Sequence, residues 1–287
     1  MEPIHVDTDE VLLAARPELA EEGGGGRMVL AVIALVAAVA GGIYFWWQWD
    51  EAAGVPEEVT ASQVAAPSPT PIVPQEEEVP AQNPVEESAA AEPLPALEES
   101  DATAANLLAD LGGKKAVTAL FLSDHVIQRI VATVDNLPRR EAPVKVWPVK
   151  PLGSWFEAMA DGSGYVVGPK NAARYAPYVK VVKALDAQKM AATYRQFYPL
   201  FQEAYRTLGF PKGHFNDRLV EAIDDLLETP EPKAPLRLVQ NKVRYEFADP
   251  DLDQRSAGQK ILLRMGVGNA QVVKAKLREF RQYVAKG

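Results

Sequence analysis

MVLAVIALVAAVAGGIYFWW, residues 28–47, is a run of twenty residues without a charged side chain. At a rise of about 1.5 Å per residue, a helix of this length spans roughly 30 Å, the thickness of a bilayer's hydrocarbon core. Buried helices of soluble proteins rarely contain so long an apolar run. We therefore predict one transmembrane helix over residues 28–49, which divides the chain into a short N-terminal segment, 1–27, and a long tail.

Basic residues near the run predict its orientation. Arg16 and Arg27 precede it, whereas the next basic residue on the other side is Lys114. Because Lys and Arg close to a span tend to stay in the cytoplasm, we expect a single-pass protein of the bacterial inner membrane. Its N-terminus would be cytoplasmic and its tail periplasmic or otherwise extracytoplasmic. Aromatic rings suit the headgroup layer, and five lie at the exit end of the run: Tyr44, Phe45, Trp46, Trp47 and Trp49.

A cleaved signal peptide is the alternative to an uncleaved anchor. Residues 38–40, Ala-Val-Ala, resemble the small-x-small pattern of a cleavage site. However, the apolar run continues past them to Trp47, and Glu18, Glu21 and Glu22 make the preceding segment acidic, which is unusual for a signal peptide. The sequence favours an uncleaved anchor and leaves cleavage open.

Charge separates the rest of the tail into two parts. Residues 50–111 contain fourteen acidic side chains and no Lys or Arg, whereas residues 112–287 contain eighteen acidic and twenty-eight basic side chains. Residues 50–104 are rich in Pro, Glu and Ala and contain no aromatic residue. Such a segment cannot bury enough apolar surface to offset its ordering entropy. We predict a disordered, extended linker over residues 50–104 that carries a C-terminal globular domain, 105–287.

The C-terminal domain is predicted to be mainly α with minor β structure. Apolar residues at helical spacing, beginning with Val126, Ile127 and Ile130, predict a helix that ends before Pro138 and is capped by Ser123. Further helices are expected over 171–185, from Asp186 to about 208 with a kink or break at Pro199, and over 216–228, 250–265 and 269–285. We expect only one or two short strands, within 164–168 and 236–247. The chain has no Cys, so no disulfide forms.

The segment YEFADPDLDQRSAGQKILLRMGVGNAQVVKAKLREFR, residues 245–281, resembles the end of a bacterial family known as domain of unknown function 3014. Three other segments carry the same resemblance: FLSDHVIQRIVATVDNLPR at 121–139, FYPLFQEAYRTLGFP at 197–211 and FNDRLVEAIDDLLETP at 215–230. The resemblance covers roughly residues 105–287. It implies membrane anchoring ahead of the domain, and it implies neither an established activity nor catalytic residues.

Polar residues in the most distinctive stretch are the candidate binding site. The functional interpretation is an anion or partner site between the last two helices, and the alternative, which we favour, is a structural role. In that alternative Arg264 is paired internally and Asn269 caps the last helix. The candidates are Arg244, Tyr245, Arg255, Gln259, Arg264 and Asn269.

Three other patterns are weaker candidates for chemistry. Asp249, Asp251 and Asp253 open like a calcium loop, but Gln254 and Lys260 replace the Gly and Glu that such a loop needs, so a helix cap is favoured. A metal site at His125 and His214 would need a neighbouring carboxylate, which their spacing does not indicate. A catalytic pair from the helical face of Glu221, Asp225 and Glu228 is less expected than a solvated surface. We assign no catalytic residue, metal or cofactor.

These observations predict a membrane-anchored envelope protein that binds a partner rather than catalysing a reaction. Residues 28–49 would contact the inner membrane, and the basic domain would bind an envelope protein or an anionic wall or lipid surface. Nucleic acid is not expected, because the domain would be exported and shows no RNA- or DNA-binding motif. The alternative is an envelope hydrolase or modifying enzyme that acts on a wall or lipid substrate through an unrecognised carboxylate site.

Overall fold

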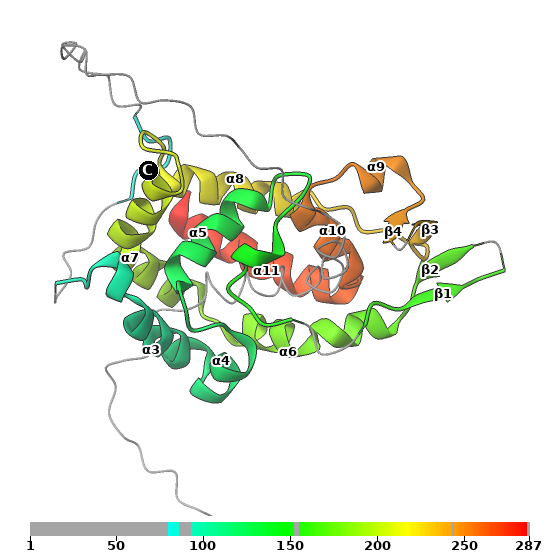
Figure 1. Ribbon diagram of the computed structural model, residues 1–287, viewed down its shortest axis with the longest axis horizontal. Helices are drawn as coiled ribbons and strands as arrows, with labels where there is room; N and C mark the ends of the chain where they lie inside the picture. Colours follow the sequence, from blue (N-terminus) through cyan, green and yellow to red (C-terminus); the bar gives the residue numbers. More distant parts are fainter. Residues whose placement is uncertain (1–79, 86–92, 152–154, 163, 243, 286–287) are drawn as a thin grey trace, which may run out of the picture.

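Three long helices form the frame of the domain: α6 (Lys170–Ala184), α7 (Ala187–Thr207) and α11 (Val267–Val284). The computed structural model describes residues 80–85, 93–151, 155–162, 164–242 and 244–285, and in these it is mainly helical (Figure 1). Helix α11 packs against both α6 and α7 and also against α8 (Phe215–Leu227). The mainly α fold that the sequence predicts is therefore confirmed for the described part.

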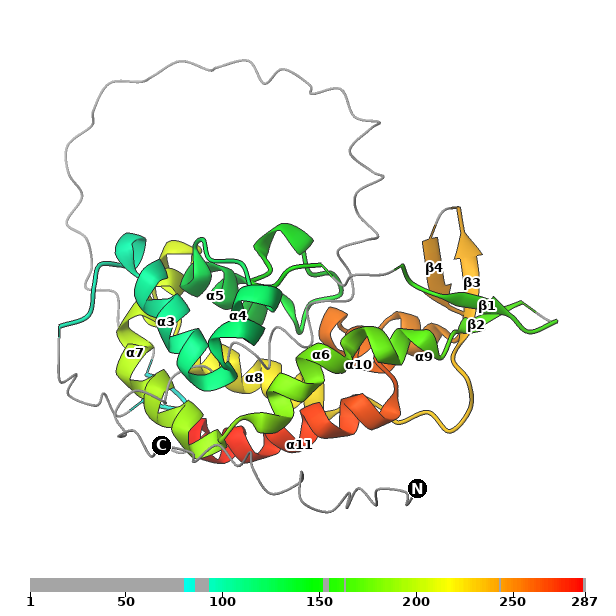
Figure 2. The same cartoon turned by 90° about the horizontal axis from the view of Figure 1, so that it is seen from below.

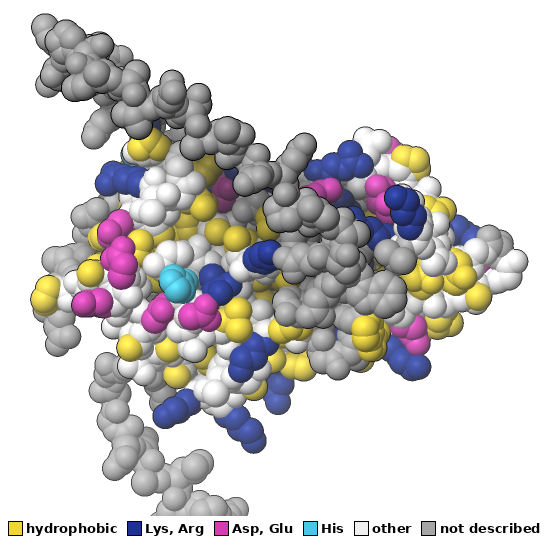
Figure 3. All heavy atoms as spheres, viewed as in Figure 1, with side chains coloured by type: hydrophobic (Ala, Val, Ile, Leu, Met, Phe, Trp, Pro, Cys, Tyr) yellow, Lys and Arg dark blue, Asp and Glu magenta, His cyan; other side chains and the backbone are white. Residues whose placement is uncertain are grey.

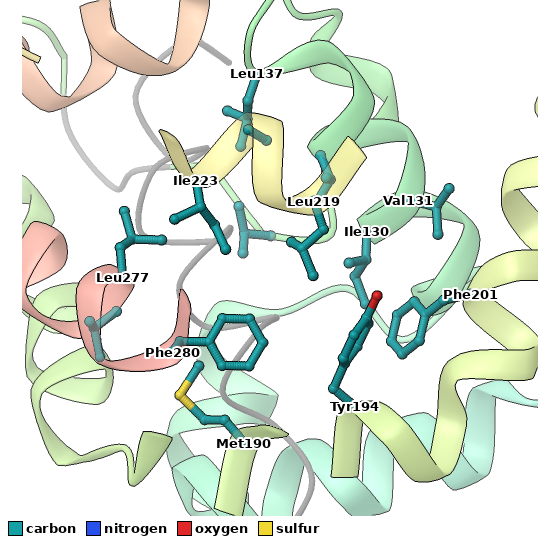
Figure 4. Close-up of a cluster of buried hydrophobic side chains, with 14 of the residues drawn as sticks. Ile130, Val131, Leu137, Met190, Tyr194, Phe201, Leu219, Ile223, Leu277 and Phe280 are labelled. Carbon is teal, nitrogen blue, oxygen red and sulfur yellow. The ribbon is translucent and has the colours of Figure 1, made fainter. Parts of the chain in front are cut away.

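The core lies between α5 (Val126–Asn136), α7, α8 and α11 (Figure 4). Ile130, Met190 and Phe280 are completely buried there, and Tyr194 meets Phe280 edge to face with ring centroids 6.2 Å apart. The apolar stripe predicted from Val126 to Val134 is buried as expected. Burying one such side chain contributes about 1.5–3 kcal/mol, so this layer stabilises the helical body.

Helix α7 begins where the sequence predicts and continues past its proline. The Asp186 carboxylate accepts the backbone N–H of Lys189 at 2.9 Å and so caps the first turn. The predicted break at Pro199 is absent, since α7 is one element up to Thr207. Likewise, α6 runs through Pro177. Gly209, with a φ of 117°, follows the end of α7 in the position expected for a helix-ending glycine.

Helices before residue 121 were not predicted individually: η2 (Leu97–Glu99), α3 (Asp101–Gly112) and α4 (Lys114–Leu120). Asp101 of α3 accepts the N–H groups of His125 (2.8 Å) and Val126 (2.9 Å), and therefore caps α5 from another helix. The cap expected from Ser123 is wrong, because His125 is the residue that precedes α5 and no side chain of its own caps the helix. The 3₁₀ turn η3 (Val144–Val146) follows α5.

A four-stranded antiparallel sheet lies at one end of the molecule (Figures 1 and 2). Three of its strands fall within the predicted ranges 164–168 and 236–247, whereas the first strand was not predicted, so the expected number of one or two strands is too low. The three residues of the first strand, Ala-Met-Ala, carry neither β-branched nor aromatic side chains and are too few to show alternation. The strands pair in sequence order and are β1 (Ala158–Ala160), β2 (Tyr165–Val167), β3 (Arg237–Asn241) and β4 (Arg244–Phe247).

The inner face of the sheet forms a second, smaller core. Leu238 and Phe247 pair across β3 and β4, and both contact Leu263 of α10 (Ala257–Arg264). The single helix predicted over 250–265 is two helices, α9 (Pro250–Asp253) and α10, because Ser256 caps a new helix by accepting the N–H of Gln259 at 3.1 Å. This second core connects the sheet to the helical body.

The predicted membrane helix, 28–49, and the N-terminal segment, 1–27, lie outside the described residues, as does most of the predicted linker. Among the residues that are described, no helix is both long and apolar enough to cross a bilayer. Two pieces of the predicted linker region are described, 80–85 and 93–104, and both contact the domain. Val85 and Leu94 pack against the main core, and Leu97 belongs to it.

Candidate binding surfaces

Arg255 and Gln259, two of the predicted site residues, meet at a carboxylate of α8. Gln259 Nε2 donates to Asp225 Oδ1 (3.1 Å) and to the Asp225 carbonyl (2.6 Å), while Arg255 Nη1 donates to Gln259 Oε1 at 2.9 Å. The Ser256 hydroxyl donates to Asp225 Oδ2 at 2.6 Å. The start of α10 is thus held on α8 by a polar network, which is the structural role considered for these residues.

Burial raises the pKa of the Asp225 carboxyl above its usual range, although the hydrogen bond from Ser256 opposes the shift. Nearby Glu228 and Glu221 add to the rise through like-charge repulsion. Both of these glutamates are exposed, and Glu221 forms an ion pair with Arg218 at 2.6 Å. Of the three acids predicted to share one helical face, only Asp225 is turned into a packed interface.

Arg264 and Tyr245 lie near the junction of the sheet with the helical body. The Arg264 guanidinium is buried over the Phe247 ring, 5.2 Å from its centroid, and burial lowers its pKa. Tyr245 packs edge to face on Tyr165 with centroids 5.2 Å apart. Both residues therefore stabilise the second core. Arg244 begins β4 and is partly buried.

Asn269 joins two helices instead of capping one. Its Nδ2 donates to the carbonyls of Ala172 and Met265, both at 2.9 Å, and so connects the first turn of α11 to α6. The expected N-cap role is wrong, because α11 begins two residues earlier and Gly266 precedes it. The six predicted residues therefore do not form one site: Gln259 binds Asp225 and Arg255 binds Gln259, three lie at or near the sheet, and Asn269 lies against α6.

The weaker candidates for metal binding also have structural roles. Asp249 accepts the N–H of Asp251 at 2.9 Å and caps α9, which confirms the favoured interpretation of this motif. His125 is exposed, has a left-handed φ of 51° and lies 3.7 Å from Asp124. Within the described ranges, no group of three or more His, Asp or Glu side chains is placed to hold a metal ion.

The outer face of the sheet is the surface that sequence reasoning missed. Met159 pairs with Val166, which pairs with Arg237, and Val239 follows on the same face because side chains alternate along a strand. Met159 and Val239 are 42% and 48% exposed, and Trp155, four residues before Met159, is 63% exposed. Figure 3 shows hydrophobic side chains reaching the surface at this end, with Lys and Arg among them.

The sequence contains only a short pattern that indicates this exposed face. Trp155 and Met159 have the even spacing of one strand face, yet the strand itself covers only Ala158–Ala160. Arg237 lies next to the apolar residues and is paired with Asp161 at 3.2 Å. The face thus combines aromatic, thioether and guanidinium groups, which are enriched at protein interfaces.

Comparisons with known proteins identify a family and no function. The model of a family described as "Protein of unknown function (DUF3014)" matches residues 126–281, more than half of the chain. The resemblance inferred from sequence is therefore confirmed. No curated protein and no solved structure matches the chain significantly. The matched range contains the sheet, most of the main core and the network around Asp225.

Proposed function

Because the chain belongs to the DUF3014 family, whose description gives no activity, we propose a function from its own residues: a membrane-anchored envelope protein whose C-terminal domain binds a protein partner. The outer face of the sheet is the contact surface in this proposal. The domain acts as an adaptor and does not catalyse a reaction.

The exposed outer face of the sheet is the observation that supports this proposal. Monomeric proteins seldom expose large contiguous apolar patches, and those that are exposed commonly mark sites of interaction. Trp155, Met159 and Val239 supply apolar area, and Trp side chains that become buried in an interface are often among the residues that contribute most to binding. The sheet also stands at one end of the molecule, where a partner can reach it without contacting the helical body (Figure 2).

The net charge of the domain indicates which charge its partner surface should have. Residues 112–287 carry ten more basic than acidic side chains. An acidic partner surface would therefore be attracted, which accelerates encounter and disfavours basic proteins. We propose a partner that combines an apolar patch with acidic residues around it.

The proposed anchor depends on residues 28–47 and on the basic residues Arg16 and Arg27 before them. An alkaline phosphatase reporter fused after Asp101 should be active, because this enzyme matures only outside the cytoplasm. The same reporter fused before Arg27 should be inactive. The reverse pattern would contradict the proposed topology. It would not test the proposed contact surface on the sheet.

A hydrolase remains the second candidate, and one observation favours it. The raised pKa of Asp225 is the property that a general acid requires. In the structure its oxygens already accept hydrogen bonds from Ser256 and Gln259, which suits a structural role. Turnover of a wall or lipid substrate by the purified chain, abolished in Asp225→Asn, would establish the enzyme instead of the adaptor.

Site-specific photocrosslinking in intact cells tests the adaptor directly. A photoreactive amino acid at Met159 or at Val239 should give the same protein adduct by mass spectrometry. Leu208 is the matched control, since it is also apolar and 42% exposed but follows α7, away from the sheet (Figure 1). No adduct from either sheet position, or the same adduct from all three positions, would contradict the proposed surface.

A further inference from the structure

Residues 80–85, Pro-Ala-Gln-Asn-Pro-Val, lie against the domain as a short peptide without helix or strand that bends at Gln82 and Asn83. Alternate side chains are turned inward: those of Ala81, Asn83 and Val85 are partly buried, whereas Pro80, Gln82 and Pro84 are exposed. Val85 packs against the main core. Every second side chain is thus turned toward the domain, and at the bend the N–H groups of Gln82 and Asn83 reach the same carboxylate.

Asp217, in the first turn of α8, binds the backbone of this segment. Its Oδ2 accepts the N–H of Gln82 at 3.0 Å, and its Oδ1 accepts the N–H of Asn83 at 2.7 Å. Oδ1 also accepts the side-chain Nδ2 of Asn83 at 3.1 Å. Hydrogen bonds to an ionised carboxylate are stronger than those between neutral groups, so three of them on one side chain form an effective contact.

Asn216, the neighbour of Asp217, binds the same residue from the other side. Its Nδ2 donates to the carbonyl of Asn83 and to that of Val284, both at 2.8 Å. Asn216 is completely buried, and its Oδ1 has no hydrogen-bond partner among the described residues. The site therefore lies where the start of α8 meets the end of α11, and it binds Asn83 through its N–H, its C=O and its side chain.

We propose that Asn216 and Asp217 form a binding site for short, bent peptides with an Asn–Pro step, and that residues 80–85 occupy it as an intramolecular ligand. Most of the contacts go to the peptide backbone, so the ligand need not come from this chain. The Asn side chain adds specificity through its amide. The following proline keeps Asn83 out of helical conformations and has no N–H that would be left unpaired.

The intramolecular ligand would compete with any added peptide. Only seven residues separate Val85 from Pro93, where the described chain resumes. A connection this short gives an effective concentration on the order of millimolar. An added peptide should therefore bind the unmodified chain at least about tenfold more weakly than a chain whose own segment cannot dock. This inference does not depend on the proposed sheet surface.

A peptide titration tests the site. The probe is the acetylated, amidated hexapeptide PAQNPV, and binding to the purified 287-residue chain is followed by saturation-transfer NMR. The double variant Asn83→Pro/Val85→Gly vacates the site, because it removes one N–H, the side-chain amide and the apolar contact. Circular dichroism identical to that of the unmodified chain establishes that the variant is folded.

Asp217→Ala in the vacated chain should weaken peptide binding by about tenfold or more, because it removes three charge-assisted hydrogen bonds. Methylation of the backbone nitrogen of the peptide's Asn should also weaken binding by about tenfold or more, because it removes the shortest of these bonds. Glu228→Ala is the matched control, since it removes an exposed acid just after the same helix and should leave binding unchanged. A folded, vacated chain that binds no peptide at about 10 mM, well above the expected effective concentration, would overturn the proposal. Equal effects of Asp217→Ala and Glu228→Ala would do so as well.

Discussion

Gly258→Ala probes a close contact between α10 and α8. Gly258 is the second residue of α10, and its N–H donates to the Leu137 carbonyl just after α5 at 3.0 Å. A Cβ at this position would lie 2.6 Å from Leu226 Cδ2 and 3.3 Å from the Leu137 oxygen. Leu226 is itself buried, so the methyl group forces α10 away from α8 or displaces the leucine.

The expected cost follows from two opposing effects. Overpacking a core contact costs about 1–3 kcal/mol. Replacing Gly by Ala in a helix gains up to about 1 kcal/mol. We therefore expect a net loss of about 1–2 kcal/mol in the free energy of unfolding. For a domain of this size that corresponds to a fall of about 2–8 °C in Tm, measured by thermal unfolding with circular dichroism.

Gly268→Ala is the control for this prediction. Gly268 is likewise the second residue of its helix, α11, but a Cβ there would have no neighbour within 4 Å. Only the helix-propensity gain remains, so Tm should rise by about 1–4 °C. If both variants shifted Tm in the same direction and by similar amounts, the argument from close approach at Gly258 would be refuted.

Three further predictions concern buried polar groups. Because burial raises the pKa of Asp225, the folded chain binds its proton more tightly than the unfolded chain, and stability falls as pH rises from the usual value towards the raised one. As the pH rises through this interval, the Tm of Asp225→Asn should therefore increase relative to that of the unmodified chain. A Tm difference that does not change with pH would contradict the raised pKa of Asp225. Tyr194→Phe should raise the free energy of unfolding in urea by about 1 kcal/mol, because the Tyr194 hydroxyl is buried without a hydrogen-bond partner among the described residues. A clear decrease in this free energy would show that the hydroxyl does form a hydrogen bond. Asp135→Ala should cost about 3 kcal/mol, since it removes the buried partner of Arg218 and leaves this side chain only the exposed Glu221. Arg139→Ala, which removes the more exposed partner of Asp135, should cost under about 1 kcal/mol, and equal costs would contradict this division.

Most patterns within one helix were predicted because they depend on local spacing, although the caps expected from Ser123 and Asn269 were wrong. The Asp186 cap, the stripe from Val126 to Val134 and the helix-ending Gly209 all require only neighbours in the sequence. Contacts between residues that are distant in the sequence were missed, because local spacing carries no information about them. The cap of α5 comes from Asp101, and the partner of Gln259 is Asp225, more than thirty residues away.

The candidate site was predicted only in part. Arg255, Gln259 and Arg264 are polar residues in a distinctive stretch, as expected, but burial and pairing give them structural roles that spacing alone does not reveal. The outer face of the sheet was missed because β1 has three residues without a strong strand preference. The segment around Asn83 was missed because its Pro-rich, acidic surroundings are typical of disorder, and its binding depends on two residues of α8.

The pairing of β2 with β3 determines at which stage of folding the proposed contact surface forms. Tyr165 pairs with Leu238, and helices α6, α7 and α8 lie between them in the chain. Closing so long a loop costs entropy that local hairpins do not lose, so the two hairpins can form early but join only after the helices have packed. Met159 and Val239 therefore come to lie on one sheet face late in folding. A nascent or partly unfolded chain would not present the surface, and partner binding would report that the domain has matured.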